Sequence, residues 1–347
     1  MGQPVIIQVE NICYPILAIV GVPANLVTIM ILSRELCDLS KCVTRYFVAM
    51  AVADLSVLVF DVIFYEIKDY YFPNLFFNYT PICTLSIVLN MASVDCSVWL
   101  TVAFTFDRFV AISCQKLQIK YCSAKTATVV IGMVCSVSIL QTVPTYFAFE
   151  PREIIDNRPW SCSVKASFYK LPLWIAYRWM EIILTPFLPF VLILLFNVLT
   201  IRSIVQTNRV TRRLRGNEKD LRHNDPQMVN RRNSMIILMA ISGNFIILWT
   251  VTLVTYLLVQ FTDVTLLVAS YNDPFTILEQ TGYMLRTLTC CTNTFIYAVS
   301  QRKFKDELKN LIMIPISLLI PFFKSPELDE KLDICICVIV FSNPYVN

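Results

Sequence analysis

Long apolar segments alternate with short polar ones along almost the whole chain. Each apolar segment has about 20 residues or more, which is the length that an α-helix needs to cross a bilayer. Runs this long exclude the alternating pattern of barrel strands. The sequence therefore predicts an all-α membrane protein, a seven-transmembrane helix bundle with spans near residues 12–33, 44–65, 82–110, 125–148, 177–205, 234–260 and 274–299.

A shorter helix of a different kind is predicted after the seventh span. Phe304, Leu308 and Leu311 follow one another at i, i+4 and i+7, and Lys303, Lys305 and Lys309 lie around them. This spacing is typical of a short amphipathic eighth helix on the inner leaflet. We therefore expect a short extracellular N-terminus (1–11), the seven-helix domain (12–300), the amphipathic helix (301–312) and a cytoplasmic tail (313–347) without an assigned function.

Positive charge is concentrated in alternate loops. Lys and Arg cluster after the first, third, fifth and seventh spans, while the other loops are mixed or acidic. Because such loops stay in the cytoplasm, we expect an extracellular N-terminus and a multi-pass protein of the plasma membrane. The same rule accounts for the basic loop after the fifth span, so the expected partner is the lipid bilayer and not nucleic acid. A mean hydropathy of +0.61 agrees with this class.

Two of the thirteen cysteines are expected on the oxidising side of the membrane. Cys83 opens the third span and Cys162 lies in the second outer loop, so we predict a disulfide between them. Asn78 begins an outer glycosylation sequon, Asn78-Tyr79-Thr80.

An acid–base pair marks the other end of the third span. Arg108, in Asp107-Arg108-Phe109, is 25 residues after Cys83. A charged pair at a membrane edge is a functional site by default, because burying charge there is costly. Further motifs follow the predicted helices in order: Asn25, Asp54, Phe245 with Trp249, and Asn293 with Tyr297 and Phe304.

Together these motifs, from about residue 12 to 312, resemble the rhodopsin-like (class A) G-protein-coupled receptors. The resemblance implies that the chain is not an enzyme and that Asp107, Arg108 and Phe109 contact a heterotrimeric G protein. It also implies an activation switch, formed by Phe245, Trp249, Asn293 and Tyr297.

The resemblance further implies a sodium site. Asp54, Ser97 and Asn293 would offer one carboxylate and two neutral oxygens, which suit a hard cation. The alternative is a polar hydrogen-bond cluster without an ion. No other cofactor is expected.

Several positions depart from the family pattern. Val251 and Thr294 stand where proline is usual, so the kinks that proline causes are missing. Asn197 stands where tyrosine is frequent. Arg231-Arg232 replace the acid that holds the arginine of the third helix in many relatives, so we expect measurable ligand-free signalling.

Within the family, the chain is similar to the group of G-protein coupled receptor 139. Val22–Asn25, Ser97–Val102, Thr105–Ala111 and Leu248-Trp249 carry this likeness. It implies a small zwitterionic ligand, such as an aromatic amino acid, and coupling chiefly through Gq. Thr252 stands where that group has an arginine, so the ligand preference does not transfer directly.

Helical periodicity places Asn90, Met91 and Val94 on the inward face of the third helix. Asn90 occupies the position where receptors for monoamines have an aspartate, which disfavours a monoamine ligand. The seventh helix contains no lysine, which excludes a retinal Schiff base.

Arg286, in the middle of the seventh helix, allows two interpretations. Its guanidinium could clamp a ligand carboxylate, with Glu181 or Asp95 meeting an amine. It could instead form an internal ion pair with Asp95 or Asp61, as buried charges in membranes often do. The candidate ligand-binding residues are Asn90, Met91, Val94, Glu181, Trp249, Thr252, Tyr283 and Arg286.

The first hypothesis is a receptor for a small extracellular ligand. The second is a receptor for a short peptide, favoured by the acidic outer loops and by Arg152 and Arg158. A transporter or channel is a distant third, because it predicts inverted repeats and helices broken by glycine. The chain has only six glycines and no visible repeat.

Overall fold

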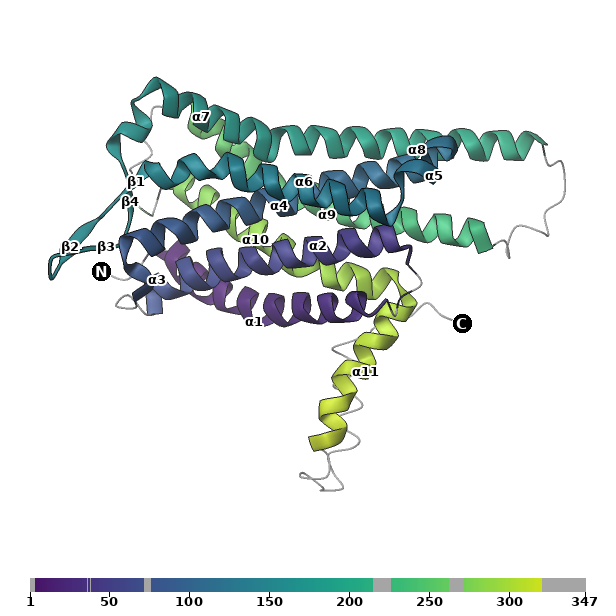
Figure 1. The fold of residues 1–347 in the computed structure, drawn as a ribbon, viewed down its shortest axis with the longest axis horizontal. Helices are drawn as coiled ribbons and strands as arrows, with labels where there is room; N and C mark the ends of the chain where they lie inside the picture. The colour runs from purple at the N-terminus through teal and green to yellow at the C-terminus, as the bar shows by residue number, and fades with distance from the viewer. Residues whose placement is uncertain are drawn as a thin grey trace.

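The computed structural model describes residues 4–35, 37, 39–71, 76–214, 226–261, 271 and 273–319. In this part of the chain, seven long helical segments lie side by side as one bundle, and a shorter helix leaves it at one end (Figure 1). The part of the predicted tail beyond residue 319 lies outside the described residues. So do residues 215–225, which belong to the basic loop after the fifth span.

The helical segments follow the predicted spans, with different ends. They are α1 (Val5–Ser33), α2 (Lys41–Val57) with its π-helical continuation η1 (Leu58–Ile67), α4 (Thr80–Ser113), α6 (Ala124–Thr142) with η3 (Val143–Ala148), α7 (Pro172–Ile182) with η5 (Ile183–Phe187) and α8 (Leu188–Leu214), α9 (Pro226–Phe261) and α10 (Pro274–Ser300). Short helices α3 (Lys68–Tyr71), η2 (Phe76–Asn78), α5 (Gln115–Tyr121) and η4 (Ala166–Tyr169) lie between them.

Six of these segments, within the described residues, are long and apolar enough to cross a membrane. The seventh, α10, is more polar, because it carries Glu279, Arg286 and Asn293. It nevertheless packs between α9 and α1 inside the bundle. The prediction of a seven-helix bundle is therefore confirmed, and the polarity of α10 indicates that its side chains serve more than lipid contact.

The two ends of the bundle differ. At one end, β1 (Phe149–Glu150) pairs with β4 (Ser163–Val164), and β2 (Glu153–Ile155) pairs with β3 (Arg158–Trp160) in an antiparallel hairpin. The N-terminus lies at this hairpin end, and α11 (Arg302–Leu319) turns away from the bundle at the opposite, Arg108 end (Figure 1).

The helix α4 forms the centre of the bundle, since it contacts α2, α6, α8 and α9. Its apolar side chains enter two buried clusters. One surrounds Phe47, Phe104 and Tyr297 near the Arg108 end, and the other surrounds Phe245 and Trp249 halfway along. In a bilayer, close van der Waals packing of such rings, and not their removal from water, stabilises the contacts between helices.

Close helix packing at α1 depends on one glycine. A Cβ atom on Gly21 would lie 2.6 Å from the Cys291 sulfur and 2.6 Å from a methyl of Leu58. Only a residue without a side chain allows α1 to approach α10 and η1 this closely.

The missing prolines leave α9 and α10 as continuous helices through Val251 and Thr294. Thr294 instead shares a 2.8 Å hydrogen bond with Thr28 on α1. The irregular turns occur at η1 and at η5, which contains Pro186. Since π-helical turns are frequent at functional sites, these two segments draw attention to the residues that they carry.

The eighth helix, α11, continues beyond the expected end at residue 312 to Leu319. Phe304 is fully buried and its ring lies 5.9 Å from that of Tyr297, while Leu308 and Leu311 pack against the same cluster. The predicted apolar face thus attaches α11 to the bundle.

Candidate ligand cavity and signalling sites

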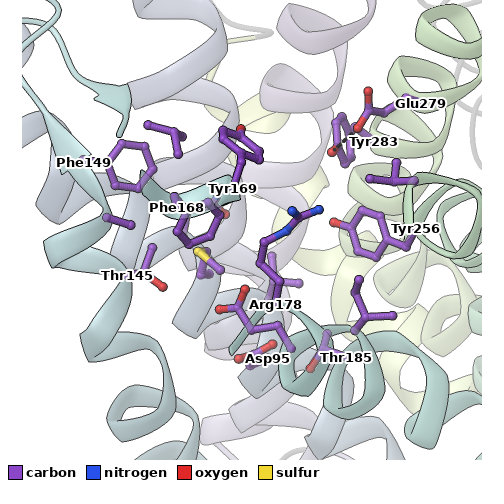
Figure 2. Close-up of a pocket in the computed structure, with 18 of the residues that line it drawn as sticks. Asp95, Thr145, Phe149, Phe168, Tyr169, Arg178, Thr185, Tyr256, Glu279 and Tyr283 are labelled. Carbon is purple, nitrogen blue, oxygen red and sulfur yellow. Dashed lines mark hydrogen bonds between the residues drawn. The ribbon is translucent and has the colours of Figure 1, made fainter. Parts of the chain in front are cut away.

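A cavity of about 700 Å³ lies at the hairpin end of the bundle. Helices α4, α7, α9 and α10 form its walls, and the loop between α6 and α7 contributes to it (Figure 2). This volume is in the range of sites for small molecules. Its lining includes aromatic, acidic and basic side chains. Among them are Asn90, Met91, Val94, Asp95, Thr145, Phe149, Phe168, Tyr169, Lys170, Arg178, Glu181, Thr185, Trp249, Tyr256, Phe275, Glu279, Tyr283 and Arg286.

The outer loop is fixed over this cavity by covalent and backbone bonds. Cys83 and Cys162 form the predicted disulfide. The backbone N–H of Ser161 donates to the carbonyl of Asn78 (2.6 Å), and the Thr80 hydroxyl donates to the Ser161 carbonyl (2.6 Å). The β1–β4 pair places Phe149 opposite Val164, and both line the cavity.

The sequon residue Asn78 lies under this loop and is only 5% exposed. A glycan on its side chain would require the loop to move away. The geometry therefore does not support the glycosylation that the sequon suggests.

Arg286 forms an internal ion pair in the cavity wall. Its guanidinium lies 3.1 Å from the carboxylate of Asp61, which η1 supplies. Asn90 donates to the other oxygen of Asp61 (2.7 Å), and Thr287 donates to the first oxygen at 3.4 Å. The Arg286 guanidinium also lies 5.2 Å from the centre of the Tyr283 ring. Of the two interpretations of Arg286, the internal pair with Asp61 is the one that the structure contains.

Thr252 does not line the cavity. Its side chain is fully buried, and its hydroxyl donates to the carbonyl of Gly282 on α10 (2.9 Å). This residue connects α9 to α10, where a Cβ atom on Gly282 would lie 3.2 Å from the Thr252 hydroxyl oxygen. The expectation that Thr252 contacts a ligand is therefore corrected, because a helix contact occupies it.

The remaining ligand candidates do face the cavity. Met91, Val94 and Trp249 line it, and the Tyr283 hydroxyl donates to Glu279 (3.0 Å). Figure 2 shows Arg178 extending between Tyr169 and Tyr256.

Sequence reasoning missed most of the aromatic wall. Tyr256 is seven residues after Trp249 and thus on the same helix face, which could have revealed it. Phe149, Phe168 and Tyr169 come from the loop, where no periodicity indicates which side chains point inward.

A polar cluster lies halfway along the bundle. The Ser97 hydroxyl and the Asn293 amide donate to the two oxygens of Asp54, at 2.5 and 2.8 Å. The Asn293 amide oxygen is buried without a hydrogen bond. Next to this cluster is a cavity of about 10 Å³, close to the minimum that holds one water molecule. Three kinds of oxygen suited to a hard cation thus converge here, although Arg286 lines the same small cavity.

The predicted switch residues connect the two cavities to the Arg108 end. Trp249 lines both cavities and stacks on Phe245, with ring centres 5.1 Å apart. Tyr297 stacks on Phe47 at 4.3 Å, and its buried hydroxyl makes no hydrogen bond. Trp249 and Phe245 thus belong to the buried cluster halfway along the bundle, and Tyr297 to the cluster near the Arg108 end.

At the Arg108 end, the guanidinium of Arg108 is paired with Asp107. The Cys42 thiol donates to the same carboxylate (3.2 Å), and the Arg108 guanidinium lies 5.9 Å from the Phe104 ring centre. The Phe109 ring stacks near Phe196 of α8, at 5.9 Å. The side chains of Arg231 and Arg232 at the start of α9 lie outside the described residues. That no acid at this position holds Arg108 therefore stays a prediction.

Residues 24–297 match the family model described as "7 transmembrane receptor (rhodopsin family)". The match includes the ligand cavity, the polar cluster around Asp54 and the Arg108 end. It leaves out the start of α1, the last residues of α10 and the helix α11.

Proposed function

Because the chain belongs to the rhodopsin family of seven-transmembrane receptors, we propose that a small aromatic ligand in the 700 Å³ cavity activates the G protein at the Arg108 end. Members of this family are receptors that signal through G proteins and are not enzymes. In this proposal the hairpin end is extracellular. The distribution of Lys and Arg among the loops supports this orientation, as does the disulfide at that end.

The composition of the cavity wall carries the proposal. Rings of Phe149, Phe168, Tyr169, Tyr256, Phe275, Tyr283 and Trp249 surround it, together with both acidic and basic side chains. Flat aromatic walls favour an aromatic ligand, and a few charged groups fix its orientation. A zwitterionic aromatic amino acid, such as tryptophan or phenylalanine, satisfies both requirements.

The likeness to the group of G-protein coupled receptor 139 supports the same ligand class and coupling through Gq. The arginine of that group is replaced by Thr252, which is buried against Gly282. A ligand carboxylate must therefore find another partner here than in that group. Arg286 is available only in competition with Asp61.

A short peptide is the second candidate. The hairpin β2–β3 is exposed at the mouth of the bundle and carries charges of both signs, on Arg152, Glu153, Asp156 and Arg158. A peptide that enters the cavity could contact this hairpin with its remaining residues.

We also propose that a sodium ion binds at Asp54, Ser97 and Asn293. The unpaired amide oxygen of Asn293 and the Asp54 carboxylate suit it. Such an ion would stabilise the resting state of the bundle by bridging α2, α4 and α10.

Occlusion of the cavity tests the ligand proposal. Inositol-phosphate accumulation is measured in cells that express the receptor, titrated with tryptophan and phenylalanine. Met91→Trp should abolish the response, because the larger side chain fills the cavity, and should leave ligand-free signalling unchanged. The matched control is Met133→Trp, since Met133 is 63% exposed on the outer face of α6.

If Met91→Trp and Met133→Trp respond like the unmodified receptor, the ligand does not enter this cavity. If the receptor responds only to peptides, and truncation of the hairpin removes that response, the peptide candidate replaces the amino-acid one.

A further inference from the structure

Two of the carboxylates that line the ligand cavity have neither an ion pair nor the tyrosine hydrogen bond that Glu279 accepts. Asp95 comes from α4 and Glu181 from α7, and both belong to the cavity wall. Within the described part of the chain, neither forms an ion pair. This differs from the other buried carboxylates that face cations, Asp61 and Asp107, which are paired with Arg286 and Arg108.

The polar side chains closest to these two carboxylates are uncharged: Gln141 and Thr185 at Asp95, and Tyr177 and Thr145 at Glu181. Asp95 is 8% exposed and accepts a hydrogen bond from the side-chain amide of Gln141 on α6. Glu181 has one carboxylate oxygen that is buried and accepts no hydrogen bond. A carboxylate buried in a membrane bundle is costly unless a cation compensates its charge.

Arg286 and Arg178 attract Asp95 and Glu181 electrostatically, but neither cation lies within ion-pair distance of these carboxylates in the described residues, and each has another contact. Arg286 lies 3.1 Å from Asp61. The guanidinium of Arg178 lies over two rings of the loop, 6.0 Å from the centre of Phe168 and 5.4 Å from that of Tyr169. Cation–π contacts of this kind hold an arginine without using a carboxylate. Asp95 and Glu181 are therefore left in the cavity wall without an ion pair to a cation of the receptor.

We propose that Asp95 and Glu181 form a two-carboxylate subsite that binds the primary ammonium group of an aromatic ligand. The inference rests on the proposed function, because it concerns the same cavity. It develops the interpretation from the sequence in which Glu181 or Asp95 meets an amine, at a place other than that of Asn90. The carboxylate that family receptors for monoamines carry at that position is absent, and two others lie further along α4 and across on α7.

The orientation of a zwitterionic ligand follows. With its ammonium between Asp95 and Glu181, the ligand carboxylate points toward Arg178 and Lys170, which line the same cavity. Arg286 then keeps its pair with Asp61, and the aromatic part lies against the rings of α9 and α10. This arrangement leaves no buried charge without a partner.

Three probes of similar shape and different charge test the subsite. Phenethylamine carries a cation, 3-phenylpropionate an anion and 2-phenylethanol no charge. Each is added at millimolar concentration to the purified full-length receptor in lipid nanodiscs, and the apparent Tm is measured. Phenethylamine should raise the Tm, and the other two should not.

The variants assign the effect to residues. Glu181→Gln should weaken phenethylamine binding at least about tenfold, since one charged contact is lost. Asp95→Asn combined with Glu181→Gln should abolish the shift and raise the Tm of the unliganded receptor. Glu279→Gln is the matched control: Glu279 lines the same cavity but accepts from Tyr283. Phenethylamine should raise the Tm of the Glu279→Gln receptor as it does for the unmodified one.

The subsite is refuted if phenethylamine fails to stabilise the receptor, stabilises the Glu181→Gln receptor equally, or loses its effect in Glu279→Gln. Ligand-free signalling of the same variants separates this failure from that of the proposed function. If the receptor activates its G protein but phenethylamine does not raise its Tm, only the proposed subsite is refuted. One that never activates a G protein loses the proposed function.

Discussion

The ion pair between Arg286 and Asp61 makes a quantitative prediction. The side chains are 13% and 9% exposed, so solvent screens the pair little. Removing one partner of a buried pair costs about 3–5 kcal/mol, whereas replacing both partners by groups of similar volume is often neutral or stabilising. We therefore expect Asp61→Asn and Arg286→Met to destabilise the receptor strongly and the double variant to recover most of the loss.

The two single variants should not be equal. In Arg286→Met, the Asp61 carboxylate keeps hydrogen bonds from Asn90 (2.7 Å) and Thr287 (3.4 Å). In Asp61→Asn, the guanidinium of Arg286 loses its negatively charged partner and keeps a neutral amide oxygen and the Tyr283 ring, while its Nε already lacks an acceptor. Asp61→Asn should therefore be the more damaging change.

The apparent Tm of the four receptors in nanodiscs measures this double-mutant cycle. Arg178→Met is the matched control, because Arg178 lies in the same cavity but forms no ion pair in the described residues. It should cost less than Arg286→Met. A double variant as unstable as the sum of the two single variants would refute the reasoning, since the pair would then contribute nothing beyond its separate residues.

Three further variants and one labelling experiment have expected outcomes. Gly21→Ala should cost about 1–3 kcal/mol through overpacking, read as a lower Tm, whereas Gly132→Ala, with no atom within 4 Å of the new methyl, should not destabilise. Asp54→Asn should abolish any difference in Tm between sodium and choline chloride; a difference that persists would contradict the sodium proposal. Asp107→Asn should raise ligand-free inositol-phosphate accumulation, because its neighbouring arginine is released; unchanged accumulation would argue against the resting pair. Burial, reinforced by Asp107, raises the pKa of the Cys122 thiol to about 12, so iodoacetamide should label it more slowly at pH 8 than a free cysteine, as mass spectrometry can measure; equal rates would refute this.

The spans, the disulfide and the coupling motif could be predicted because each depends on local sequence. A helix needs about 20 apolar residues, and Cys83 and Arg108 lie at opposite ends of one such run. The residues at which the helices begin and end are harder to predict from the sequence. The helix α1 begins at Val5, before the span predicted from residue 12, and no side-chain cap marks its start.

The ligand cavity depends on pairings between distant elements, which periodicity does not supply. From the sequence, either Asp95 or Asp61 could form the ion pair with Arg286. In the structure the partner is Asp61, which the π-helical segment η1 carries. Thr252 is on the right helix but faces Gly282 and not the cavity. The loop residues Phe168 and Tyr169 have no signal in the sequence, because only the disulfide and the short strands fix their place.

The central claim is that ligand in the cavity drives G-protein activation through the Arg108 end. The most direct test is nucleotide exchange on purified heterotrimeric Gq, Gi and Gs with the receptor in nanodiscs, with and without tryptophan or phenylalanine. We expect the receptor to accelerate exchange on Gq, the amino acid to increase it further, and Arg108→Ala to abolish both effects. Exchange no faster than with empty nanodiscs on all three G proteins, with or without the amino acids, would contradict it.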